Sequence, residues 1–111
     1  MNSSYKNGLT ALAGGGQSGA TPIGNISGNG DAVNNRFTTV ANAGDSAILP
    51  LAAPGLEYRV FNQTTTSMNV FPAVGDAING GSANAAFAVA ANKGAIFVCM
   101  VAGFWNAILS A

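Results

Sequence analysis

The sequence predicts an all-β protein whose body is a small β-sandwich or jelly-roll-like unit of seven or eight short strands. Runs rich in Val, Ile, Phe, Tyr and Thr recur between residues 36 and 111. Clusters of Gly, Pro, Asn and Asp interrupt these runs at a spacing of roughly 8–12 residues, which is typical of sandwiches and barrels. No segment combines the length and the 3.6-residue apolar period of a stable helix.

Each expected strand is bounded by residues that favour turns. The segment Leu56–Asn62 alternates apolar and polar side chains over most of its length, as a half-buried strand does. The segment Ala95–Val101 is apolar throughout and predicts a buried strand. Gly75-Asp76 and Asn79-Gly80-Gly81 favour turns with positive φ angles. The expected strands are Arg36–Val40, Ser46–Leu51, Leu56–Asn62, Met68–Pro72, Ala85–Ala90, Ala95–Val101 and Phe104–Leu109.

Residues 1–35 are expected to form an extended arm, and residues 36–111 the body. The arm is rich in Gly, Ser and Asn, and its apolar residues stand apart from one another. Such a segment buries too little apolar surface to offset the entropy of its own ordering. We therefore expect the arm to lie on neighbouring subunits, where its apolar side chains fill separate pockets. The expected anchors are Tyr5, Leu9, Leu12, Ile23 and Ile26.

Charge is unusually scarce. Asp, Glu, Lys and Arg make up 7% of the residues, and the formal net charge is zero, whereas an average soluble domain has roughly 25% charged residues. Nucleic-acid binding draws on many Lys and Arg contacts, so four scattered basic residues exclude that partner. A surface with so few charges is poorly protected from self-association. We therefore expect partner chains to cover much of it; an uncharged secreted β-domain is the alternative.

No catalytic residue, cofactor site or metal site is predicted. The chain has no histidine, so it lacks the commonest general base and metal ligand. Its single cysteine, Cys99, lies in an apolar run and is expected to be a small buried side chain. Asp45 and Asp76 each follow a glycine, where an Asp side chain typically bonds local backbone N–H groups. Asp31 and Glu57 sit in no supporting motif.

Neither end of the chain predicts a membrane or export segment. Gly94–Ala111 is uncharged and mostly apolar, and its length is close to the ~17-residue minimum of a spanning helix. Gly103 and Asn106 interrupt it, and its Val, Ile, Phe and Trp content favours strands. The apolar stretch near the N-terminus, Gly8–Gly16, is too short and too rich in glycine for a signal peptide.

The last expected strand is the candidate oligomer interface. Phe104 and Trp105 are adjacent, so on a strand they point to opposite faces, one toward the core and one outward. An outward aromatic in a chain with so little charge favours a contact between subunits, and a sugar-stacking platform is the alternative. The residues expected at this interface are Phe104, Trp105 and Ile108.

The segment from Ala47 to Trp105 resembles a module found in structural proteins of tailed bacteriophages. It contains Leu49-Pro50 followed by Pro54-Gly55-Leu56, an alternating strand that ends in Asn62, and the unit Val70–Gly80, which reads Val-Phe-Pro-Ala-x-Gly-Asp-x-Ile-Asn-Gly. It closes with an Ala-rich strand, a Lys-Gly turn, Ile-Phe-Val-Cys and Gly-Phe-Trp. The likeness covers about half the chain and leaves the residues before Arg36 out.

The resemblance implies a virion part, either a capsid decoration (cement) protein or a tail or fibre module. For the decoration reading it implies a homotrimer on the outer surface of the capsid, with the N-terminal arm contacting the major capsid protein. Such a protein bridges capsid subunits and catalyses no reaction. The alternative is a tail- or fibre-associated module that recognises a host surface glycan.

Overall fold

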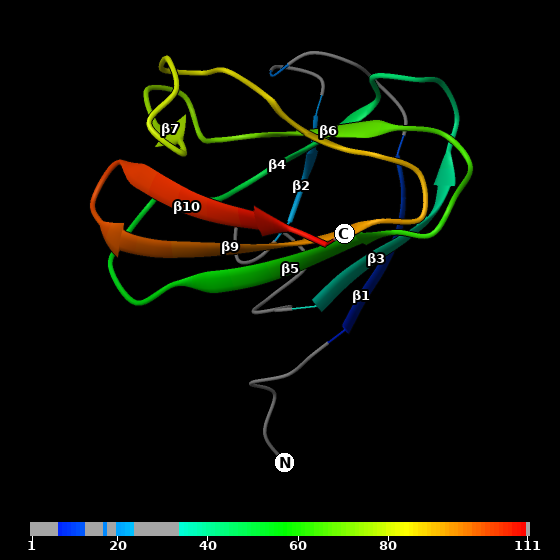
Figure 1. Ribbon diagram of the computed structural model, residues 1–111, viewed down its shortest axis with the longest axis horizontal. Helices are drawn as coiled ribbons and strands as arrows, with labels where there is room; N and C mark the ends of the chain where they lie inside the picture. Colours follow the sequence, from blue (N-terminus) through cyan, green and yellow to red (C-terminus); the bar gives the residue numbers. More distant parts are fainter. Residues whose placement is uncertain (1–6, 13–16, 18–19, 24–33, 111) are drawn as a thin grey trace.

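The computed structural model describes residues 7–12, 17, 20–23 and 34–110, which form strands and no helix. Two sheets face one another (Figure 1). The six-stranded sheet has the order β1-β3-β5-β9-β10-β7, and the four-stranded sheet has the order β2-β4-β6-β8. The strands are β1 (Asn7–Leu12), β2 (Thr21–Pro22), β3 (Asn34–Val40), β4 (Ser46–Ile48), β5 (Glu57–Asn62), β6 (Met68–Phe71), β7 (Ala77–Ile78), β8 (Phe87–Val89), β9 (Gly94–Val101) and β10 (Phe104–Leu109).

The first six strands alternate between the two sheets. Strands β1, β3 and β5 are parallel neighbours in one sheet, and β2, β4 and β6 are parallel neighbours in the other. The chain therefore makes three passes, and each pass adds one strand to each sheet. Strand β9 then pairs antiparallel with β5, and β8 pairs antiparallel with β6. In each sheet, the antiparallel strand therefore lies next to the last of the three parallel strands, β9 beside β5 and β8 beside β6.

The prediction of an all-β, sandwich-like fold is confirmed. Eight strands, β3–β10, lie within residues 34–109, where seven or eight were expected. The last strand has the predicted bounds, and the glycines and asparagines expected at turns, Gly75, Asn79 and Gly80, have positive φ angles. The connectivity is not that of a jelly roll, because jelly rolls are antiparallel and five of the strand pairs here are parallel.

Part of the segment expected as an arm belongs to the body. The backbone of β1 pairs with β3, and the backbone of β2 pairs with β4. Ile23 directly after β2 is 0% exposed and packs in the core, and its backbone N–H donates to the carbonyl of Ile48 at 3.1 Å. The boundary expected at residue 35 therefore does not hold for these residues.

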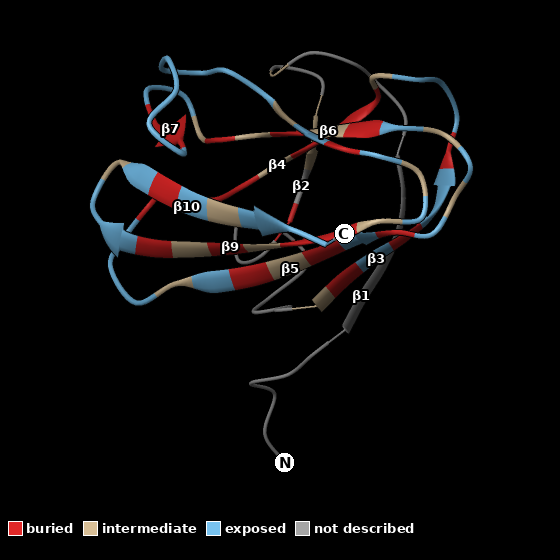
Figure 2. Cartoon of the chain, viewed as in Figure 1, coloured by how far each residue is buried: buried red, intermediate tan, exposed pale blue. Residues whose placement is uncertain are grey.

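The core fills the space between the sheets, and buried residues alternate with less buried ones along β5, β9 and β10 (Figure 2). Two pairs of aromatic side chains pack within the core. Tyr58 and Trp105 pack with their ring centroids 6.0 Å apart, and Phe87 meets Phe97 edge to face at 5.5 Å. Such pairs add about 0.5–1.5 kcal/mol each to the stabilisation from burial.

A buried asparagine ties the two sheets together. Asn62 ends β5 in the six-stranded sheet, and its side-chain N–H groups donate to the carbonyls of Thr66, Val89 and Ala90 at 2.8, 3.1 and 3.3 Å. Its carbonyl oxygen accepts from the N–H and hydroxyl of Thr64 at 3.2 and 2.7 Å. One side chain therefore orders the β5–β6 loop and anchors the end of β8.

Replacing this side chain should destabilise the fold. Asn62→Ala leaves buried backbone carbonyls without their donor, and we expect a loss of about 2–3 kcal/mol in the free energy of unfolding. Urea unfolding followed by tryptophan fluorescence measures it. The matched control, Asn106→Ala, removes an exposed amide on β10 and should cost far less. Equal losses in the two variants would contradict the role given to Asn62.

Candidate interaction surface

The described acidic residues act in structural contacts. Asp45 is buried at a turn, and its carboxylate accepts the backbone N–H of Asn42 at 3.0 Å, as predicted for a turn Asp. Asp76 was expected to bond nearby backbone groups, but its carboxylate accepts the N–H of Ala52, 24 residues away in the sequence, at 2.9 Å. This hydrogen bond links two loops. Asp31 lies outside the described residues. Within the described part of the chain, no group of three or more His, Cys, Asp or Glu side chains could hold a metal ion.

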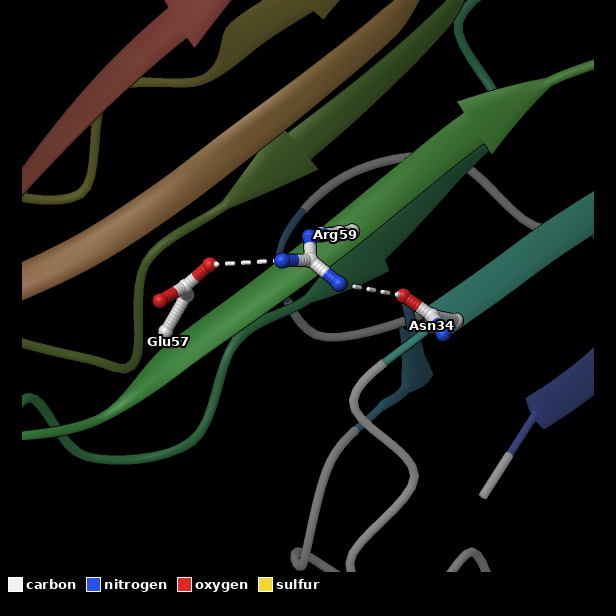
Figure 3. A network of polar contacts seen from close by, with 3 residues as sticks. All are labelled: Asn34, Glu57 and Arg59. Carbon is white, nitrogen blue, oxygen red and sulfur yellow. Dashed lines mark hydrogen bonds and ion pairs between the residues drawn. The ribbon is translucent and has the colours of Figure 1, made fainter. Parts of the chain in front are cut away.

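Glu57 and Arg59 form an ion pair on the outward side of β5. Arg59 Nη2 lies 3.2 Å from Glu57 Oε2, and Arg59 Nη1 donates to Asn34 Oδ1 on β3 at 3.3 Å (Figure 3). Both charged side chains are more than one-third exposed, so solvent screens the pair and it contributes little to stability. Arg36 is exposed on the neighbouring strand β3, where it pairs with Phe61, and adds a third charge to this outward face.

Cys99 is a core residue, as predicted. It is 1% exposed, it lies on the inner side of β9, and its thiol donates to the carbonyl of Val101 at 3.2 Å. Burial raises the pKa of the Cys99 thiol above its ordinary value. A buried thiol with a raised pKa is a poor nucleophile, because the thiolate is the reactive form.

The C-terminal apolar segment forms strands, as predicted. Residues 94–101 and 104–109 are β9 and β10. The described residues contain no helix that is long and apolar enough to cross a membrane.

The outward side of β5, β9 and β10 carries an apolar surface, which we call the outer strip: Phe61, Ile96, Val98, Met100 and Ile108. Along β9 the inward residues alternate with Ile96 and Val98, which are half-buried, and Met100, which is 69% exposed. Ile108 on β10 pairs with Ile96 on β9 and is 70% exposed. Ile96 therefore lies between Ile108 and Arg59, and Val98 lies between the exposed Asn106 and Glu57, so polar side chains border the strip on both sides. Neither β9 nor β10 contains a charged residue.

A glycine on the strip holds the aromatic ring of Phe61. Phe61 on β5 pairs with Gly94 on β9. A Cβ atom at Gly94 would come within 2.5 Å of the Phe61 ring, so the ring lies directly over the glycine. Aromatic residues are used in this way to cover a strand glycine from the neighbouring strand. The absence of a side chain at residue 94 therefore leaves the space that the Phe61 ring occupies.

The edge of β10 is closed by an asparagine. Strand β7 pairs with only the first two residues of β10, Phe104 and Trp105. Beyond them, Asn79 takes the place of a strand: its side-chain oxygen accepts the N–H of Ala107 at 2.8 Å, and its side-chain nitrogen donates to the Ala107 carbonyl at 3.2 Å. Asn79 has a φ of 56°. An edge capped in this way cannot offer Ala107 to the strand of another chain.

Among the predicted interface residues, the structure separates Trp105 from the other two. Phe104 is 52% and Ile108 70% exposed, so both are accessible to a partner. Trp105 is 1% exposed and packs on Tyr58 in the core. Its assignment to the interface is wrong, because alternation along β10 turns it inward once Phe104 faces outward.

The predicted arm anchors do not form one group. Ile23 is wrong as an anchor on a neighbour, because it is buried in the core of its own chain. The backbone of Leu9 and Leu12 lies in β1, paired with Arg36 and Val40 of β3. Tyr5 and Ile26 lie outside the described residues.

Sequence reasoning missed most of the outer strip. It expected Ala95–Val101 to be buried, and within the chain only alternate residues of this run are buried. The apolar character of Ile96, Val98 and Met100 was the signal that could have found the strip, since these residues share one face of the strand. The cap at Asn79 had no local signal, because its partner is 28 residues away.

Comparisons of the chain with protein-family models, curated proteins and solved structures find no match.

The resemblance of Ala47–Trp105 to phage structural modules therefore rests on the residues of this sequence alone.

The Cys99 thiol should be unreactive in the folded protein. Because burial raises its pKa, less thiolate is present at pH 8 than for a free cysteine, and the thiol is also out of contact with solvent. We expect reaction with a coloured disulfide reagent to be more than about tenfold slower in buffer than in guanidinium chloride. Release of one equivalent of the coloured thiolate at the same rate in buffer and in guanidinium chloride would show that Cys99 is accessible in the folded protein.

Opening the edge of β10 should promote aggregation. Asn79→Gly keeps the positive φ angle without strain but removes the side chain that occupies Ala107. We expect faster growth of light scattering on warming, since an open strand edge recruits other chains. Asn92→Gly is the matched control, because Asn92 also has a positive φ (59°) but lies in the turn before β9. Identical scattering curves for the two variants would argue against the capping role.

Proposed function

We propose that this protein is a non-enzymatic structural subunit of a virion that decorates and stabilises a phage capsid on its outer surface. The observation that carries the proposal is the outer strip, whose uncharged apolar side chains are half-buried or exposed among the described residues of a chain with 7% charged residues. Exposed apolar patches of this kind mark interaction sites. An assembly subunit is the class of protein that keeps such a surface permanently covered.

The proposed mechanism is adhesive. The subunit bridges neighbouring major capsid protein subunits and binds the assembled shell rather than the free subunits. A ligand that binds only one state stabilises that state by mass action. Bridging therefore opposes the outward pressure of packaged DNA without any chemical step, and it needs neither a cofactor nor a metal ion.

The oligomer proposed for this subunit is a homotrimer, which is the form that the resemblance implies. Phe104 and Ile108 are the exposed residues of the predicted interface that remain after Trp105 is removed from it. Attachment through residues of the N-terminal segment also remains a proposal, with Leu9 and Leu12 carried by β1 and Ile23 removed from the set.

Labelling of intact particles tests the function. Antibodies raised against the chain, coupled to gold and applied to particles in the cell lysate, should label the whole surface of the capsid. Labelling confined to tails or fibres would contradict decoration and favour the glycan-binding alternative. Failure to label any particle, with the chain detected elsewhere in the same lysate, would contradict a virion function altogether.

A further inference from the structure

The side chain of Asn79 takes the place of a peptide group in the ladder between β7 and β10. The backbone N–H of Asn79 donates to the carbonyl of Trp105 on β10 at 2.8 Å. The next contact along β10 is made by the Asn79 side chain, which accepts the Ala107 N–H at 2.8 Å and donates to the Ala107 carbonyl at 3.2 Å. The side-chain amide can do this because it carries both a donor and an acceptor, as a peptide group does.

The cap on Ala107 requires the amide form of residue 79. An ionised carboxylate has hydrogen-bond acceptors only. It could still accept the Ala107 N–H, but its second oxygen would face the Ala107 carbonyl, where the amide now donates. Two acceptors that face one another repel, and the Ala107 carbonyl would lose its donor. Exchange of the side-chain nitrogen for oxygen therefore opens this edge of β10.

The residue after Asn79 makes this exchange chemically accessible. Asparagine is a thermolabile residue, and its amide is lost when the backbone nitrogen of the following residue attacks the side-chain Cγ. A side chain on the following residue hinders the attack, and here that residue is Gly80. Both residues are exposed to solvent, and a Cβ atom at Gly80 would meet nothing within 4 Å. The attacking nitrogen therefore lies in open surroundings.

We propose that Asn79-Gly80 is a deamidation site, at which spontaneous loss of the amide irreversibly removes the cap from β10. Hydroxide takes the proton of the Gly80 N–H, the nitrogen bonds to Asn79 Cγ, and Nδ2 leaves as ammonia after taking a proton from water. Water then opens the cyclic imide at Cγ, which gives aspartate, or at the main-chain carbonyl, which gives isoaspartate with one more carbon in the main chain. The net reaction consumes one water and releases one ammonia, and it does not depend on the function proposed above.

The cap slows the reaction that destroys it. Closure of the imide ring turns Cγ of Asn79 toward the main chain of Gly80, whereas the cap holds the side-chain amide against Ala107 on the neighbouring strand. The two hydrogen bonds to Ala107 must therefore break before the ring closes. Their loss should slow deamidation about tenfold relative to an unstructured segment. Deamidation then starts from those moments in which the edge of β10 is already open.

Peptide mass spectrometry of the full-length chain, incubated at mildly alkaline pH, tests the site. Asn92 is the internal control, because it is also exposed and has a positive φ (59° against 56° at Asn79) but is followed by Lys93. Asn79 should convert to the acid faster than Asn92 in the same chain, and about tenfold more slowly than in a free peptide of residues 74–86. Peptide mapping also separates Asn79 from the Asn-Gly pairs at residues 7 and 29. No conversion at Asn79, or faster conversion at Asn92, would overturn the site, and equal rates in chain and peptide would overturn the protection.

Two variants with the same charge test the loss of the cap. Asn79→Asp and Asn92→Asp each add one negative charge to a chain whose formal net charge is zero, and added charge by itself opposes association. Asn79→Asp should nevertheless scatter light sooner on warming than Asn92→Asp, because only the first variant opens a strand edge. The chain converted at Asn79, separated by anion exchange, should behave as Asn79→Asp does. Identical scattering curves for the two variants, or a converted chain that scatters like the original, would overturn the proposal.

Discussion

The register of β9 between β5 and β10 is the constraint on which the rest of the structure depends. Pairing of Ile96 with Arg59 on one side and with Ile108 on the other turns Phe97, Tyr58 and Trp105 into the core. Because side chains alternate along a strand, a slip of one residue would exchange the two faces. The same register that builds the core therefore also assembles the outer strip, and the folding interactions and the interaction surface cannot be varied independently along these three strands.

The local elements could be predicted from the sequence, while the pairing of strands could not. The turn residues Asn79, Gly80 and Gly103 and the bounds of β10 follow from backbone preferences that act within a few residues. The parallel stacking of β1, β3 and β5 joins segments more than twenty residues apart, and no local pattern distinguishes a parallel from an antiparallel neighbour. Strands β1 and β2 were missed because they lie in a segment rich in Gly, Ser and Asn with no strand period, and only their pairing with β3 and β4 identifies them.

In the candidate site, too, local patterns could be predicted from the sequence, and contacts between distant residues could not. Alternation predicted that Phe104 and Trp105 point to opposite faces, but only the core contact with Tyr58 decides which of them is buried. Ile23 resembled an isolated apolar residue in a glycine-rich segment, and its burial depends on a backbone bond to Ile48 far along the chain. The scarcity of charge, by contrast, could be read directly from the sequence. In the structure, β9 and β10 contain no charged residue and carry the exposed apolar side chains of Met100 and Ile108. The assembly role that we propose would account for both observations.

Oxidation of the methionines tests the central claim, that the outer strip is an exposed surface of the single chain which becomes covered in an assembly. Met100 on the strip is 69% exposed in the single chain, and Met68 in the core is 0% exposed and serves as the internal reference. After brief treatment with hydrogen peroxide, peptide mass spectrometry measures the sulfoxide formed at each residue. The account predicts that Met100 oxidises rapidly in the isolated chain and more slowly in particles that carry the chain, while Met68 stays slow in both. The same oxidation rate at Met100 in the isolated chain and in the particles would contradict it.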